Sequence, residues 1–218
     1  MIVGVDILNY SDIPLRELKK AKTKVALYEA CLSLMGDKIF REVMLDDICR
    51  KAEVSRVTFF NFFQRKEDLL VYFMRVWLTE RIIEIAAEQK RGFSAVRHLL
   101  NKVAQQSEEK KGLMPSLISS LVEMNMHPCM PELSEAEVRL LFPGDEEIGA
   151  QTPDMFELFQ RCMSEAVMDG ELREEFTVET AVKVLFTVFY GAFLTAQLYA
   201  SSDIADFYET HLQLLLKK

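Results

Sequence analysis

The chain has 218 residues, of which 50% are hydrophobic and 28% are charged, and its formal net charge is −8. This length supports one or two domains with a sizeable core, and the ordinary globular composition excludes a disordered chain. The acidic total hides an asymmetry. Residues 10–70 hold 12 lysines and arginines against 10 acidic residues, whereas residues 71–218 hold 14 against 23. The mildly basic front and the acidic remainder therefore suggest two different kinds of partner.

Helical periodicity dominates the chain. Apolar residues recur at three- and four-residue spacing, strand-like alternation is nearly absent, and glycine (8) and proline (6) are scarce. The sequence therefore predicts an all-α fold, with an exposed, mobile loop at residues 145–151. The helices expected in chain order cover residues 15–34, 45–51, 55–62, 66–90, 93–109, 113–126, 133–142, 153–168, 177–200 and 204–216.

Residues 43–70 predict two short helices joined by a tight turn and followed by a longer helix. Ser55 is expected to cap the second short helix, because its hydroxyl can accept a free backbone N–H. Phe59 and Phe63, four residues apart, fall on one face. Two short helices with a serine-capped second one are typical of a helix-turn-helix, whose second helix can enter the major groove of DNA.

The sequence around this motif resembles a known family. The residues that carry the resemblance are Ala30, Gly36, Phe40, Ile48, Ala52, Val54, Ser55, Thr58, Phe63, Lys66, Glu67, Leu69 and Leu70. With this spacing, residues 23–70 resemble the DNA-binding domain of TetR-family transcriptional regulators without a gap. The resemblance implies a helix-turn-helix DNA-binding domain over residues 1–70, with the motif at about 44–63. Residues 71–218 would then form a helical effector-binding and dimerisation domain, which rests on fold analogy.

Five residues of the motif depart from the family pattern: Met44, Glu53, Val57, Phe60 and Phe62. The family usually has threonine at the first of these positions, glycine at the next two, and tyrosine at the fourth and often at the fifth. Each missing hydroxyl removes a potential phosphate contact, and the glutamate adds a negative charge near the turn. These departures are expected to weaken sequence-independent affinity for DNA.

The resemblance points to six residues as DNA contacts: Ser55, Arg56, Thr58, Phe60, Asn61 and Lys66. Arg56 is the best candidate for reading a base, because a guanidinium can bind guanine O6 and N7. Thr58 and Lys66 are candidates for phosphate, although Lys66 could equally be a solvated lysine at a helix start. Asn61 could contact phosphate or base, and Phe60 could touch a thymine methyl or simply pack. Asp46 could accept from cytosine, but a stabilising charge at a helix N-terminus explains it better.

The resemblance also implies a homodimer that binds double-stranded DNA at a palindromic operator, with two recognition helices in successive major grooves. Helices 153–168 and 177–200 would form a four-helix bundle with the same helices of the partner. The sequence cannot decide whether six apolar residues of the second helix face the core or the partner: Val182, Leu185, Phe186, Phe189, Phe193 and Ala196.

Regulation by a small molecule follows from the same resemblance. An apolar or amphipathic effector would enter the helical domain, move the helix at 66–90 and release a repressor from its operator. Each pocket candidate is, taken singly, better explained as ordinary core. The candidates are Met114, Leu117, Leu121, Met124, Phe156, Phe159 and Met163.

No pattern of an active site or metal site stands out. The three histidines lie far apart, the paired glutamates suit helix ends and loops, and there is no glycine-rich phosphate loop. We therefore expect no enzyme activity, no cofactor and no metal. Residues 184–202 carry no charge, but polar residues interrupt the run and no basic flank closes it, so we expect no membrane span. Four widely spaced cysteines and the absence of a signal peptide predict a cytoplasmic protein.

Two functions fit these observations. The first is a sequence-specific DNA-binding regulator of transcription, acting as a repressor. The second is a helical ligand- or protein-interaction protein whose DNA-binding module is weakened by the five departures. Salt-dependent binding to DNA distinguishes the two.

Overall fold

The computed structural model describes residues 12–124, 129–199 and 203–217. Within these ranges it contains eleven α-helices, a short 3-10 helix and no β-structure beyond an isolated bridge between Leu172 and Leu216. The predicted all-α fold is confirmed. The chain divides into two compact units. The first comprises Met1–Leu34, Val43–Glu80 and Cys129–Thr152, and the second comprises Met35–Glu42, Arg81–Pro128 and Pro153–Lys218.

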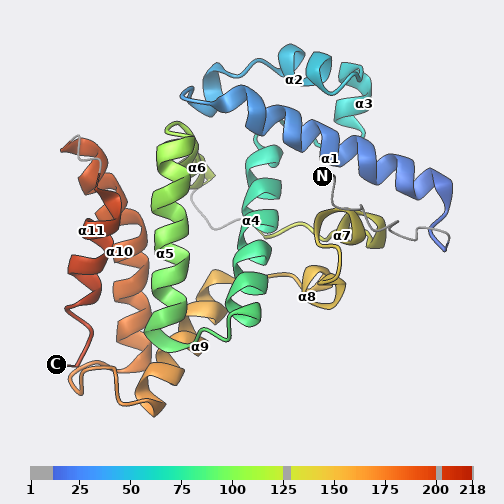
Figure 1. The fold of residues 1–218 in the computed structure, drawn as a ribbon. Coiled ribbons are helices and arrows are strands. Elements are labelled where there is room, and N and C mark those ends of the chain that lie inside the picture. The colour runs from blue at the N-terminus through green and yellow to red at the C-terminus, as the bar shows by residue number, and fades with distance from the viewer. Residues whose placement is uncertain (1–11, 125–128, 200–202, 218) are drawn as a thin grey trace, which may run out of the picture. The chain divides into compact units, whose positions relative to one another are not determined.

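The first unit surrounds the predicted motif. Its helices are α1 (Leu15–Met35), α2 (Leu45–Lys51), α3 (Arg56–Phe60), the first part of α4 (Asp68–Ala87), α7 (Glu135–Leu141) and α8 (Glu146–Ala150). Figure 1 shows α1, α2 and α3 in blue and cyan tones. Gly36 follows α1 with a φ of 47°, the left-handed conformation of a helix C-cap, as predicted. The predicted helices at 15–34 and 45–51 are confirmed almost to the residue, while α3 and α4 are shorter than expected.

The prediction of an exposed, mobile loop at residues 145–151 is wrong. Residues Glu146–Ala150 form α8, and Gly149 is buried against Phe142 and Val138 of the preceding segment. The Gly149 carbonyl accepts a hydrogen bond of 2.7 Å from Nη2 of Arg75, a fully buried residue of α4. This partner lies 74 residues away in sequence. The local pattern of acidic residues and glycine indicates solvent exposure and contains no sign of such a contact.

The second unit is a bundle of longer helices. It contains the end of α4, then α5 (Gly92–Glu109), α6 (Leu113–Met124), α9 (Met155–Met168), α10 (Val178–Leu198) and α11 (Ile204–Leu212). Helix α10 packs against α9 and α11, and α5 packs against the same two helices (Figure 1). The 3-10 helix η1 (Phe40–Glu42) lies on α6, where the Phe40 N–H donates to Ser116 Oγ at 2.8 Å.

Helix α10 is the helix of the described ranges that is long and apolar enough to cross a membrane by length and composition. Its apolar side, however, forms core within the second unit. Of the six apolar residues whose orientation the sequence leaves open, five are buried within the chain itself and Phe186 is half-buried. The length and apolar character of α10 are therefore those of a core helix.

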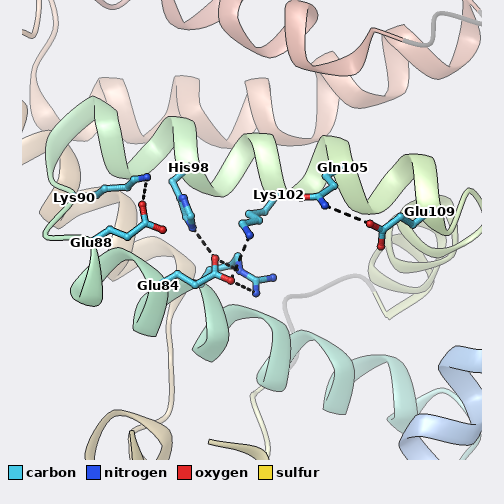
Figure 2. A network of polar contacts seen from close by, with 8 residues as sticks. Glu84, Glu88, Lys90, His98, Lys102, Gln105 and Glu109 are labelled. Atoms are coloured by element: carbon cyan, nitrogen blue, oxygen red, sulfur yellow. Dashed lines mark hydrogen bonds and ion pairs between the residues drawn. The ribbon is translucent and has the colours of Figure 1, made fainter. Parts of the chain in front are cut away.

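A polar network joins the second half of α4 to α5 (Figure 2). Glu84 of α4 accepts hydrogen bonds from Arg81 at 2.8 and 2.9 Å, lies 2.6 Å from Nε2 of His98, and lies 3.5 Å from Nζ of Lys102. Burial disfavours the charged carboxylate. The hydrogen bonds from Arg81 and His98 outweigh burial and hold the pKa of Glu84 below its ordinary value. The network fixes this part of α4 to α5.

Candidate nucleic-acid interface

The motif has the predicted helix-turn-helix geometry. Ser55 is the N-cap of α3, and its side chain accepts the Thr58 N–H at 3.1 Å, which confirms the predicted cap. In the turn before it, Glu53 has a φ of 55°. This left-handed conformation favours glycine, the residue that the family usually has there, and it costs a side chain roughly 1 kcal/mol. The departure at Glu53 thus stores strain in the turn without preventing it.

An aromatic cluster fixes the orientation of α3. Phe59 and Phe63 are buried, with ring centroids 5.5 Å apart. Phe63 lies edge-on to Tyr72 of α4 at 5.8 Å, and Tyr72 lies edge-on to Tyr28 of α1 at 5.3 Å. Such edge-to-face pairs are favourable beyond the area they bury. They attach the buried side of α3 to both α1 and α4, and this leaves its other side open to solvent.

The open side of the motif carries most of the predicted contact residues. Ser55, Arg56 and Asn61 are exposed, Phe60 is 53% exposed, and Thr58 is partly buried. Two departing residues, Met44 and Val57, are 61% and 74% exposed. Large apolar side chains without a core role mark a surface that contacts something else.

Arg56 is not a freely moving side chain in this surface. Its Nε and Nη2 donate to the two carboxylate oxygens of Asp46 in the first turn of α2. The Arg56 guanidinium accordingly lowers the pKa of Asp46. Side-on binding of this kind uses one edge of the guanidinium, so Nη1 and one N–H of Nη2 still point outward. Asp46 therefore orients Arg56, a role in addition to its favourable place at a helix N-terminus.

Lys66 lies apart from the other five predicted contact residues. It precedes α4 rather than opening it, and its Nζ donates to the Val43 carbonyl at 3.0 Å. The ammonium thus binds the segment that leads into α2. A phosphate contact would have to share this group with the carbonyl.

No family model and no curated protein sequence matches the chain. Solved structures do. The reduced form of E. coli NemR aligns over 89% of this chain and 98% of its own, with a TM-score of 0.58 and 16% identity. Thermus thermophilus FadR, a TetR family transcriptional repressor in complex with lauroyl-CoA, aligns over 88% and 92%, with a TM-score of 0.55 and 23% identity. A TetR transcriptional regulator from Streptomyces coelicolor aligns over 89% and 99%, with a TM-score of 0.52 and 17% identity.

The chain has the fold of TetR-family transcriptional regulators. The likeness extends over nearly the full length of each of these proteins, so it includes the helical part for which the sequence offers no motif. The resemblance seen in residues 23–70 is thereby confirmed at the level of the fold.

Within the TetR fold, the seven effector-pocket candidates occupy two helices of the second unit. Met114 and Leu117 of α6 are 8% exposed, whereas Leu121 and Met124 are intermediate. In α9, Phe159 and Met163 are fully buried. Phe156 is half-exposed and stacks on Phe186 of α10 at 6.4 Å. Their burial fits ordinary core as well as a pocket wall, so the effector site stays a prediction.

Sequence reasoning missed one part of this surface. A groove beside α3 is lined by Thr58 and Asn61 on one side and by Arg16 and Lys19 of α1 on the other. The available signal was the three- and four-residue spacing of cations in the segment that begins α1. The motif drew attention away from it.

Proposed function

We propose that the protein is a sequence-specific DNA-binding regulator of transcription, acting as a repressor that a small apolar or amphipathic effector releases. The observation that carries the proposal is the serine-capped α3, anchored on one side by Phe59 and open on the other, within a TetR-like fold. An anchored helix with an open side is what insertion into a major groove requires. The site of action would be the cytoplasm, where operators are accessible.

Each contact residue has a distinct proposed role. Arg56 would bind guanine through the guanidinium edge that Asp46 leaves open. Ser55, Thr58 and Lys66 would approach phosphate, and Asn61 phosphate or a base edge. Phe60, already exposed, would meet a thymine methyl.

A homodimer would supply two copies of α3 for the two halves of a palindromic operator. The proposed interface is the exposed side of α10, where Thr187, Gly191, Leu194 and Leu198 follow one another at three- and four-residue spacing. No charged residue lies between Lys183 and Leu198. An uncharged, partly apolar stripe with a glycine allows two helices to approach closely.

Leu194→Glu is expected to weaken the dimer by more than about tenfold, because it would place an unpaired carboxylate in the interface. Val122→Glu is the matched control, since Val122 is an exposed apolar residue of α6 that the proposed interface does not use. Sedimentation velocity over a range of protein concentrations measures both. A wild-type protein that stays monomeric, or a Leu194→Glu protein that dimerises normally, contradicts the proposed interface.

For the effector, the proposal rests on chemistry rather than on a located cavity. The T. thermophilus FadR structure holds lauroyl-CoA, an amphipathic molecule, in the same fold. The chain has 11 methionines, including two of the pocket candidates on α6, and methionine suits an adaptable apolar wall. To act as a switch, the effector must bind the DNA-free conformation more tightly than the DNA-bound one.

The alternative is a helical interaction protein whose DNA module has lost affinity. It is favoured by the five departures from the family motif and by the engagement of Arg56 and Lys66 in contacts within the protein. Selection from a pool of random duplexes, sequenced after binding at two salt concentrations, tests both functions. An enriched palindrome with steep salt dependence supports the regulator. A folded dimer that enriches nothing and shows no salt dependence supports the alternative.

Arg56→Ala should cost about 1–3 kcal/mol of binding free energy for the enriched duplex and relax the preference at one base position in each half-site. Arg50→Ala, which removes an equally exposed cation of α2 that pairs with Asp47 at 2.9 Å, is the matched control. Selection with each variant measures the preference directly. If Arg56→Ala lowers affinity equally for all sequences, Arg56 positions the protein and does not read a base.

A further inference from the structure

An open groove of about 1090 Å3 lies in the first unit, between the start of α1, the C-terminal end of α3 and the start of α7. Two of the predicted DNA-contact residues, Thr58 and Asn61, line it. The opposite wall is a helical stripe of α1 that includes Arg16, Lys19 and Lys20. Residues separated by three and four positions lie on one face of a helix, so these cations point into the same space.

The charges of the groove do not cancel. Its two carboxylates are already paired, Glu17 with Lys20 at 3.0 Å and Glu137 with Lys24 at 2.7 Å. Arg16 and Lys19 are left over. Both are exposed, and neither makes an ion pair with any residue that the structure describes. The groove therefore presents two uncompensated cations next to Thr58 and Asn61.

The cations of the motif itself are in the opposite situation. Arg56 is bound by Asp46, and Lys66 donates to the Val43 carbonyl. Phosphate contacts supply most of the sequence-independent affinity of a DNA-binding protein. The motif, with Met44, Phe60 and Phe62 in place of hydroxyl-bearing residues, offers few of them. The nearest cations available to a backbone that passes Thr58 and Asn61 are those across the groove.

We propose that this groove binds the phosphodiester backbone of duplex DNA, with Arg16 and Lys19 of α1 as its cationic contacts. The inference rests on the proposed function, since the strand concerned is the one that borders the major groove entered by α3. Helix α1 then contributes affinity but no sequence preference, because phosphates are the same at every step. The mildly basic front of the chain acquires a specific location for its excess charge.

The test compares Arg16→Ala, Lys19→Ala, the double variant and Lys22→Ala for binding to the enriched duplex over a series of salt concentrations. Lys22 is the matched control, because it is an exposed lysine of the same helix that does not line the groove. The slope of log K against log salt should fall by about one for each phosphate that a protomer no longer binds. Lys22→Ala should keep the wild-type slope, Lys19→Arg should restore it, and every variant should enrich the same sequence.

The outcomes separate the groove from the function on which it rests. If the double variant keeps the wild-type slope and the enriched sequence, the groove proposal is overturned while DNA binding stands. If the wild-type protein enriches nothing and binds without salt dependence, the regulator function is overturned and the groove with it. A change in the preferred sequence in Arg16→Ala or Lys19→Ala also overturns the proposal, since it would place these residues at bases instead of phosphates. Circular dichroism melting curves identify any variant whose binding is lost through unfolding.

Discussion

Gly112→Ala lowers the melting temperature of the protein by roughly 6–12 °C, as expected for a loss of about 3 kcal/mol in a chain of this length. A Cβ atom at Gly112 would lie 1.9 Å from the carbonyl oxygen of Lys38 and 2.8 Å from the Ile39 nitrogen. These are backbone atoms, so no change of rotamer relieves the overlap. The segment 36–42 must leave α6, and the hydrogen bond from Phe40 to Ser116 breaks as it does so.

Two variants define what this result means. Gly191→Ala is the matched control, because its Cβ would meet only Thr187 Cγ2 at 4.0 Å and alanine is the better helix former. Ser116→Ala removes the hydrogen bond without the overlap, and it should cost about 1–3 kcal/mol. Thermal melts and chemical denaturation measure all three. A Gly112→Ala protein as stable as wild type would mean that the segment 36–42 does not lie on α6.

The same packing explains why Gly112 matters to the proposed function. Residues 36–42 connect α1 to α2, and they are held by α6, the helix that carries four of the effector-pocket candidates. A displaced α6 would therefore act on the segment that leads into the motif. The sequence shows Gly112 only as a breaker between two helices, because the atom it must avoid is more than seventy residues earlier.

Local patterns predicted most of the fold. Apolar periodicity predicted the long helices, Gly36 ended α1, and Ser55 began α3, since caps and periodicity are properties of neighbouring residues. The failure at α8 has the opposite cause. Its burial depends on Arg75, a charged residue that a sequence reading assigns to the surface, yet it is fully buried and bonded to the Gly149 carbonyl.

The candidate site was predictable in part for the same reason. The motif and its exposed residues could be predicted from spacing, and the Phe59–Phe63 pair from its four-residue separation. Three features required the three-dimensional structure: the grip of Asp46 on Arg56, the bond from Lys66 to the Val43 carbonyl, and the groove shared by α1 and α3. Each joins segments that are ten or more residues apart, and no local rule pairs them.

Glu137 is the charged centre of the packing between α7, α1 and α4. It is 5% exposed and accepts hydrogen bonds from Tyr72 Oη at 2.9 Å and Ser134 Oγ at 2.8 Å, besides its 2.7 Å ion pair with Lys24. Burial alone would favour the neutral acid. The hydrogen bond and charge of Lys24, aided by Ser134, outweigh burial and hold the pKa of Glu137 below its ordinary value.

Glu137→Ala should lower the free energy of unfolding by about 3 kcal/mol, because it strands the Lys24 ammonium and the Tyr72 hydroxyl in a mostly buried site. Glu135→Ala, which removes an exposed carboxylate of the same helix, should cost less than about 1 kcal/mol. Denaturant titrations at neutral pH measure both. Equal losses in the two variants would contradict a special role for Glu137.

The pH dependence of this difference gives a second and independent check. Since the folded-state pKa of Glu137 is lowered, its contribution to stability is fully present above the unfolded-state pKa, near about 4.3. It is lost as the pH falls through the lower folded-state value. Wild type and Glu137→Ala should therefore differ by a constant amount above about pH 5 and converge below about pH 4. Denaturation at a series of pH values measures the gap. A gap that widens on acidification would mean that Glu137 binds its proton more tightly when folded and that Lys24 does not hold it ionised.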